Sequence, residues 1–244
     1  SLLMNTSINS TDKKLEFTGR LLFERVLTNE SASGFIEYEA FVVNNKKYLR
    51  ITNSFDAFCE NPNFVEKLTI SDEEYELIAI GSHAFDNNTG ITGTITFSSS
   101  INTIGDYAFN NCANLNGIKF KNGCKTIGDY AFSNCSLLNQ SIELPESLKT
   151  IGDYAFSNDT KMNLLIGPNY GTFTNNLTYI GDYAFYNCNS ISAELDLSKA
   201  NVEYLGTYAF SKCSSIPILI LPYKLKQIKP HTFDQCTSLD GAIN

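Results

Sequence analysis

One short motif recurs seven times along the chain and restricts the folds that are open to it. The copies begin at Ile80, Ile104, Ile127, Ile151, Ile180, Leu205 and Ile228, and four of them read Ile-Gly-Asp-Tyr-Ala-Phe. Successive starts are 24, 23, 24, 29, 25 and 23 residues apart. A near-constant period of this length is typical of solenoids, in which one repeat forms one turn of the coil. The sequence therefore predicts a repeat solenoid.

Each repeat also contains a pair of apolar residues two positions apart. This spacing indicates a short strand with one buried face, and stacked turns would align such strands in a parallel sheet. The pairs are Leu68/Ile70, Ile95/Phe97, Ile118/Phe120, Ile142/Leu144, Leu195/Leu197 and Leu219/Leu221. The expected fold is a solenoid of leucine-rich-repeat type, built from stacked short parallel β-strands.

The residue after the motif glycine is one that favours the first position of a helix. Its side-chain oxygen could accept a hydrogen bond from the free amides of a helix start, which predicts one helical turn over each Tyr-Ala-Phe. In the last copy the position holds Pro230, which suits a first helical position. The six other residues are Ser82, Asp106, Asp129, Asp153, Asp182 and Thr207.

The first part of the chain shows no clear repeat. Residues 35–43 and 46–51 resemble two strands joined by the Asn44-Asn45 turn, which predicts a β-hairpin-like cap at the N-terminal end. We expect a capping region over residues 1–53 and a solenoid of about seven to eight turns over residues 54–244, with residues 54–70 as a degenerate opening repeat. A further strand should begin near Leu239, so we expect the solenoid to be truncated there.

The repeat resembles a known family. The string Leu-x-x-Ile-Gly-Asp-Tyr-Ala-Phe, read at Leu148 to Phe156, and the continuation Phe-x-x-Cys-x-x-Leu, read at Phe132 to Leu138, are similar to the BspA-like leucine-rich repeat family. The resemblance covers roughly residues 54–244. It implies a surface protein of the kind found in mucosal bacteria and some parasitic protozoa, where several members are adhesins for host matrix proteins or other microbes.

The cysteines and histidines show no catalytic or metal-binding pattern. Five of the seven cysteines occupy one position in different repeats, where parallel side chains do not favour a disulfide, so we expect buried free thiols. Cys59 and Cys124 lie outside this position, and a bridge from Cys59 stays open. The two histidines, His83 and His231, belong to opposite ends of the solenoid and cannot share one site. The repeated aspartates could hold calcium, but helix capping already accounts for them. We predict no catalytic residue, no bound metal and no cofactor.

Charge and hydropathy exclude further classes of partner. The formal net charge is -8, whereas binding to a phosphate backbone requires clustered Lys and Arg. We therefore expect no nucleic-acid partner. No stretch is apolar enough for a membrane span, and the start lacks the basic and apolar segments of a signal peptide. We expect a mature or excised segment that does not insert into a membrane.

The outward-facing strand positions vary while the inward ones repeat, which predicts a recognition surface on the sheet. The row of outward positions contains Thr69, Thr96, Lys119, Glu143, Leu165, Asp196 and Ile220. Within it, an acidic patch of Glu143, Glu194 and Asp196 would lie beside Ile218 and Ile220. The alternative is that these are ordinary solvated strand residues.

The 29-residue repeat carries an insertion around residues 167–176. Loops on a rigid scaffold often carry binding residues, so Tyr170 and Phe173 are candidate anchors, although a merely tolerated insertion is the favoured interpretation. The ladder of motif tyrosines could likewise be a binding strip or a purely structural stack. The leading interpretation is a secreted or cell-surface module that binds a host protein, matrix component or glycan. A structural spacer and an intracellular interaction scaffold are the alternatives.

Overall fold

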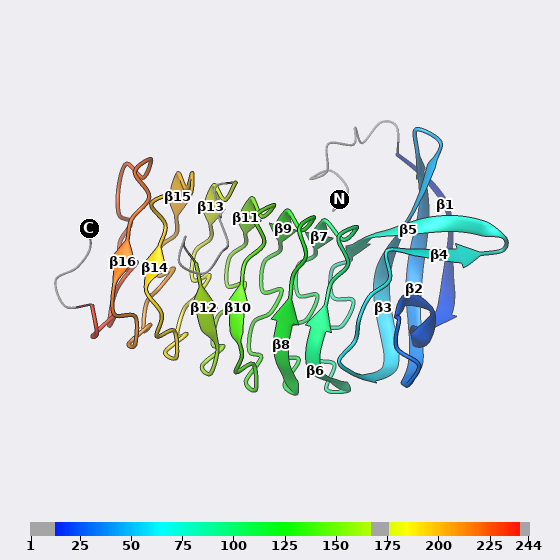
Figure 1. Cartoon of the computed structure of the whole chain (residues 1–244), viewed down its shortest axis with the longest axis horizontal. Helices are drawn as coiled ribbons and strands as arrows, with labels where there is room; N and C mark the ends of the chain where they lie inside the picture. Colours follow the sequence, from blue (N-terminus) through cyan, green and yellow to red (C-terminus); the bar gives the residue numbers. More distant parts are fainter. Residues whose placement is uncertain (1–12, 167–175, 240–244) are drawn as a thin grey trace.

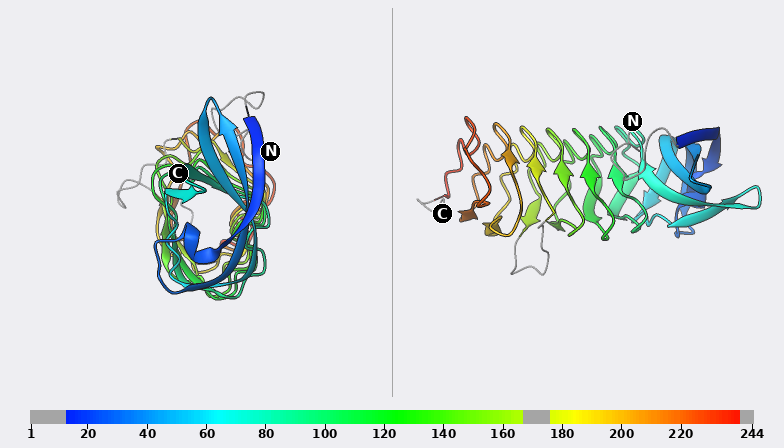
Figure 2. Two further views of the ribbon diagram at one scale, coloured as in Figure 1. Left: turned by 90° about the vertical axis from the view of Figure 1, so that its right-hand side faces the viewer. Right: turned by 90° about the horizontal axis from the view of Figure 1, so that it is seen from above.

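The chain forms an elongated coil whose turns lie side by side along one axis (Figure 1). The structure, a computed structural model, describes residues 13–166 and 176–239. Seen from the end, the turns superimpose as a ring, with the N-terminal strands lying across one end of it (Figure 2). The predicted repeat solenoid of leucine-rich type is confirmed.

One ladder of parallel strands runs without a break from the cap to the last turns. Except for the longer β5, each strand consists of the two residues before a motif glycine, and Ile80, Ile104 and Ile127 lie in register. The strands are β5 (Glu73–Ile80), β7 (Thr103–Ile104), β9 (Thr126–Ile127), β11 (Thr150–Ile151), β13 (Tyr179–Ile180) and β15 (Tyr204–Leu205).

A second ladder contains the strands predicted from the period-two apolar pairs. Its strands are β6 (Ile91–Thr96), β8 (Leu115–Lys119), β10 (Ser141–Glu143), β12 (Asn163–Leu165), β14 (Leu195–Asp196) and β16 (Leu219–Ile220). Hydrogen bonding joins β6 to β8, β10 to β12, and β14 to β16, with one isolated bridge between Ile166 and Leu195. The predicted parallel strands are therefore present, but their ladder is interrupted between β8 and β10, and only the single bridge continues it from β12 to β14.

The helical turn predicted over Tyr-Ala-Phe is wrong. The only helical element among the described residues is a 3-10 helix, η3 (Phe23–Val26), in the cap. In the repeats, the amides of Tyr107 and Phe109 donate to the carbonyls of Asp129 and Ala131 in the next turn, at 2.8 Å. Because these amides are used between turns, they are not available for bonds within a helix.

The core is a column of phenylalanines along the inside of the coil. The rings of the first six motif copies are fully buried, and successive rings stack with centroids 5.1–5.5 Å apart and planes within 15° of parallel. The column comprises Phe85, Phe109, Phe132, Phe156, Phe185 and Phe210. Each turn thus buries its aromatic side chain against its two neighbours, which is how repeat proteins share one continuous core.

Three antiparallel strands form the N-terminal cap. They are β1 (Lys13–Leu22), β2 (Ala32–Val43) and β3 (Lys46–Glu60). Asn44 and Asn45 link β2 to β3 with φ of 49° and 63°, the left-handed values that a tight hairpin requires. The predicted hairpin cap is confirmed, and β1 extends it. The division at residue 53, which falls within β3, stays a prediction.

The predicted opening repeat is wrong in one part. Leu68 and Ile70 belong to β4 (Lys67–Ile70), which pairs antiparallel with β5 as a hairpin, so Thr69 lies opposite Glu74. Asn63 instead bridges to Thr96 at the start of the second ladder. Thr69 is therefore not part of the outward row, because strand alternation alone does not distinguish a hairpin from a repeat.

Candidate functional site

The second ladder brings together most of the residues predicted to form a recognition surface. Thr96 lies in register with Lys119, Glu143 with Leu165, and Asp196 with Ile220. We call this surface, carried by β6, β8, β10, β12, β14 and β16, the sheet face. Lys119 and Glu143 are exposed, whereas Leu165, Asp196 and Ile220 are partly covered.

The acidic patch divides into two parts on the sheet face. Glu194 and Asp196 lie beside Ile218 and Ile220 on the neighbouring strand, and Ile218 is 37% exposed. Glu143 is separated from them by β12, which places Leu165 between the carboxylates. The Asp196 carboxylate also accepts a hydrogen bond from the backbone amide of Ser198 at 2.9 Å. The surface thus offers apolar contacts flanked by acidic ones.

The predicted anchors on the inserted loop, Tyr170 and Phe173, lie outside the described residues.

The motif tyrosines form a parallel aromatic stack along one edge of the coil. Successive ring centroids are 4.6–4.7 Å apart, and the stack begins at His83 and ends at His231. Every member has φ between 58° and 61°, a left-handed conformation that is unfavourable for a bulky side chain. The stack recurs with the same geometry in each turn, and six of its steps separate the two histidines.

The motif aspartates connect one turn to the next. Asp106 Oδ1 accepts the backbone amide of Asp129 at 2.8 Å, and Asp129 Oδ1 accepts that of Asp153 at 2.7 Å. Asp153 and Asp182 continue the pattern to the amide of Thr207. The side chains do accept amides, as predicted, but from the following turn and not from a helix start. Partial burial and the neighbouring aspartates raise the pKa of Asp129.

Five cysteines form a column inside the coil, which we call the cysteine column, and burial keeps them from solvent: Cys112, Cys135, Cys188, Cys213 and Cys236. All seven cysteines are buried free thiols, as predicted, and Cys112 Sγ donates to the Phe85 carbonyl of the preceding turn at 3.2 Å. Cys188 repeats this bond to Phe156 at 3.1 Å. Desolvation raises the pKa of Cys112 to about 12. Thiolate is therefore scarce at neutral pH, and the column favours packing over nucleophilic chemistry.

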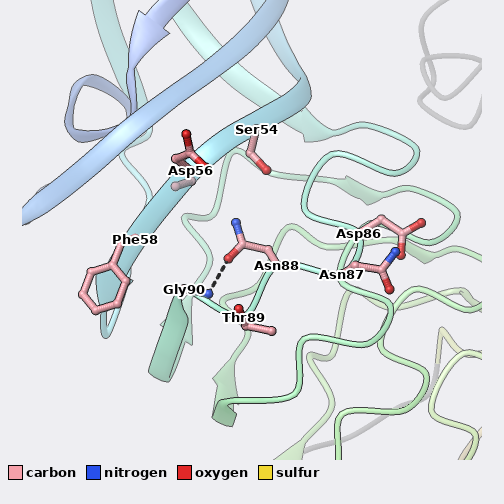
Figure 3. A pocket seen from close by; sticks show the side chains of 9 residues that line it. Ser54, Asp56, Phe58, Asp86, Asn87, Asn88, Thr89 and Gly90 are labelled. Carbon is pink, nitrogen blue, oxygen red and sulfur yellow. Dashed lines mark hydrogen bonds between the residues drawn. The ribbon is translucent and has the colours of Figure 1, made fainter.

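A pocket of about 450 Å³ lies where the cap meets the first turn of the solenoid (Figure 3). One wall is the end of β3, and the opposite wall is the turn over residues 86–90. The Cys59 amide donates to the Gly90 carbonyl at 3.0 Å and fixes the two walls together. We call this space the cap pocket.

Two irregularities position the polar side chains of the cap pocket. Asp56 has φ of 48° at a bulge in β3, opposite Gly34, and such bulges redirect side chains out of the regular alternation. Asn88 occupies the repeat position that holds cysteine in five other turns. Its Oδ1 accepts the amide of Gly90 at 2.8 Å, and its amide nitrogen points toward the strand that carries Ser54 and Asp56 (Figure 3).

Sequence reasoning missed the cap pocket. Asn88 stands where five other repeats have cysteine, but this departure alone does not indicate a role. Asp56 could not have been found, because its orientation depends on the pairing of β2 with β3.

The described residues contain neither a candidate metal site nor a candidate membrane-spanning helix. No group of three or more His, Cys, Asp or Glu side chains in residues 13–166 and 176–239 is arranged to hold a metal ion. Within the same ranges, no helix has the length and apolar character needed to cross a membrane.

Several solved structures are similar to the chain. A leucine-rich repeat protein from Bacteroides ovatus is 29% identical with a TM-score of 0.67, over 84% of this chain and 50% of that one. The pneumococcal vaccine antigen PcpA is 25% identical with a TM-score of 0.59, over 78% and 49%. The T. pallidum leucine-rich repeat protein shares the fold at 21% identity and a TM-score of 0.51, over 74% and 88%. The chain thus spans about half the length of the first two proteins.

No curated protein matches the sequence. The sequence profile of the BspA type leucine rich repeat region, in six copies, matches residues 52–170 and 168–243. These residues include every turn described above, and the fold of the chain is similar to that of the solved repeat proteins. The chain belongs to the BspA-type leucine-rich repeat family.

Proposed function

We propose that this protein is a non-enzymatic, cell-surface or extracellular binding module that recognises a protein partner through the sheet face. The observation that carries the proposal is the contrast between the two sides of the second ladder. Inward residues such as Ile118, Ile142 and Leu195 are fully or almost fully buried and similar from turn to turn. The outward residues at Lys119 and Glu143 differ in charge on adjacent turns. A scaffold that repeats from turn to turn and carries an extended, varied surface suits the way in which solenoids bind partners.

The C-terminal half of the sheet face is the best candidate for the contact itself. Ile218 and Ile220 supply apolar area, and Glu194 and Asp196 add charge beside it. Interfaces commonly combine a desolvated apolar centre with a polar rim that guides partner choice. Given this acidic rim, the favoured partner surface carries Lys or Arg around an apolar patch.

The proposed location at the cell surface is supported by the family and by the similar proteins. The family resemblance implies surface proteins, and the similar protein PcpA is a pneumococcal vaccine antigen. Tyr170 and Phe173 remain proposed anchors for the same partner.

The test is binding of the labelled protein to an array of host matrix proteins and mucins. A Glu143→Lys/Asp196→Lys variant reverses two charges on the sheet face. The matched control is Glu146→Lys/Glu203→Lys, which makes the same charge change at two exposed residues outside the sheet-face strands. Saturable binding that the first variant loses and the control keeps supports the proposal. Binding that both variants retain excludes the sheet face. A folded protein that binds nothing on the array favours the spacer alternative.

A further inference from the structure

The cap pocket contains several polar groups that the protein itself does not use. No hydrogen bond of the described residues involves the Asp56 carboxylate, the Ser54 hydroxyl or the Thr89 hydroxyl. The side-chain amide nitrogens of Asn87 and Asn88 likewise donate to no group in the part of the chain that the structure describes, although their oxygens accept bonds from Asn111 and Gly90. The pocket therefore presents donors and acceptors together, in a volume typical of small-molecule sites, roughly 300–1,000 Å³.

The cap pocket has less unpaired negative charge than its two aspartates suggest. Asp86 lines it, but one carboxylate oxygen pairs with His83 Nδ1 at 2.8 Å and the other accepts from Asn110 at 3.0 Å. Asp56 is then the one carboxylate of the lining without a partner among the described residues. A single free carboxylate surrounded by neutral donors does not provide the converging oxygens that a cation such as calcium requires.

An exposed aromatic ring adjoins these groups. Phe58 follows Asp56 on β3 and is 55% exposed, at the side of the pocket away from Asp86 (Figure 3). The ring offers an apolar surface next to hydrogen-bonding groups of both kinds. The apolar C–H face of a pyranose packs on such a ring, while its hydroxyls donate to a carboxylate and accept from amides.

We propose that the cap pocket binds a neutral sugar residue of a glycan. Asp56 accepts two sugar hydroxyls, Asn88 Nδ2 donates to a third oxygen, and Phe58 packs against the ring. An ammonium ligand would satisfy Asp56 but would leave the amide donors of Asn87 and Asn88 desolvated and unpaired, a costly arrangement. An anionic sugar would face the Asp56 carboxylate in a chain of net charge -8. The neutral sugar is the ligand that satisfies both kinds of group.

This site is distinct from the sheet face. The pocket residues precede β6 or lie on β3, whereas Glu143 and Asp196 belong to β10 and β14, at least two turns further along the coil. Sugar binding at the cap and protein binding at the sheet face can therefore be lost separately.

The experiment is a titration of the ¹⁵N-labelled protein with the methyl glycosides of glucose, galactose, mannose, fucose and N-acetylglucosamine at millimolar concentrations, followed by amide chemical shifts. At least one glycoside is expected to shift the amides of residues 54–58 and 87–90. Asp56→Asn and Asn88→Cys should each weaken this binding at least about tenfold, as expected for a lost bond to a charged or desolvated group. Cysteine at position 88 is the residue that five other turns already accommodate.

Two controls distinguish the outcomes. The Glu143→Lys/Asp196→Lys variant should bind the glycoside as the wild type does, and N-acetyl-lysinamide tests whether the pocket instead takes an ammonium ligand. The proposal is overturned if no glycoside shifts the pocket amides. It is also overturned if the pocket variants bind unchanged, or if N-acetyl-lysinamide shifts these amides where the glycosides do not.

Discussion

The phenol of Tyr204 donates a hydrogen bond to the Asp182 carboxylate at 2.7 Å, across the step from one turn to the next. The same Asp182 oxygen accepts the backbone amide of Thr207 at 2.9 Å. Desolvation and this bond raise the pKa of Tyr204, so the phenol stays protonated and donating. One carboxylate thus fixes both the backbone and a side chain of the following turn.

Tyr204→Phe should lower the free energy of unfolding by about 1–2 kcal/mol, because it removes a hydrogen bond to a charged group at a partly buried position. Chemical denaturation followed by circular dichroism measures the change. Tyr208→Phe is the control, since Tyr208 keeps its ring stacked at 4.7 Å on Tyr183 after the substitution. An equal loss in both variants would show that the phenol of Tyr204 contributes nothing specific.

Gly152→Ala should be strongly destabilising. A Cβ at Gly152 would lie 2.5 Å from Asp129 Oδ1 and 2.6 Å from the Asp129 amide nitrogen, so the backbones of two turns would have to separate. Overpacking of this kind costs about 1–3 kcal/mol or more, and the melting temperature should fall accordingly. Gly117→Ala is the matched substitution, because there the nearest atom is the end of the flexible Gln140 side chain. A milder effect at 152 than at 117 would contradict the close approach.

Asp159→Cys should stabilise the protein, and more so at higher pH. Asp159 is fully buried in the cysteine column, Oδ1 accepts the Cys135 amide at 2.8 Å, and Oδ2 has no hydrogen-bond partner among the described residues. Burial raises its pKa well above the usual value. A raised carboxyl pKa favours folding at low pH, and this contribution is lost as pH rises from about 4 through the folded-state pKa.

Denaturation curves of the wild type and the Asp159→Cys variant at several pH values between 4 and 8 test this directly, a range set by the usual carboxyl pKa of about 4. The stability advantage of the variant should grow with pH across the range. A constant difference would mean that Asp159 does not change its protonation on unfolding.

The thiols should resist labelling in the native protein. All seven cysteines are buried, and desolvation raises the pKa of Cys124 to about 12 and that of Cys236 to about 11. We expect negligible reaction with an aromatic disulfide reagent at pH 8, and reaction of all seven in denaturant. Rapid labelling of one native thiol would identify a turn that opens locally.

The sequence allowed the coil and its core to be predicted, because identical residues at a fixed period must occupy equivalent places. The local turn was mispredicted for a physical reason. Asp129 does accept an amide through its side chain, but the donor is Asp153 of the next turn, 24 residues along the chain. A capping rule reads only neighbouring residues and cannot identify such a partner.

The sheet face and the cap pocket both depend on strand pairing, which cannot be read directly from the sequence. The outward positions of the sheet face could be found from alternation, although the hairpin at Thr69 followed the same pattern. The cap pocket arises from a bulge at Asp56 and a single departure at Asn88, two features that only the folded cap brings together.

The turn-to-turn bonds described for Tyr107 and Phe109 recur at a regular spacing along the axis of the coil. Each added unit repeats the same bonds to its predecessor, so the free energy of the coil should grow by a nearly constant increment per unit, and the units should melt as a zipper from an end. Removing one whole internal unit would leave the motif amides of the remaining units with equivalent acceptors. The length of the solenoid can therefore change by one stacking distance per repeat while the core residues stay the same.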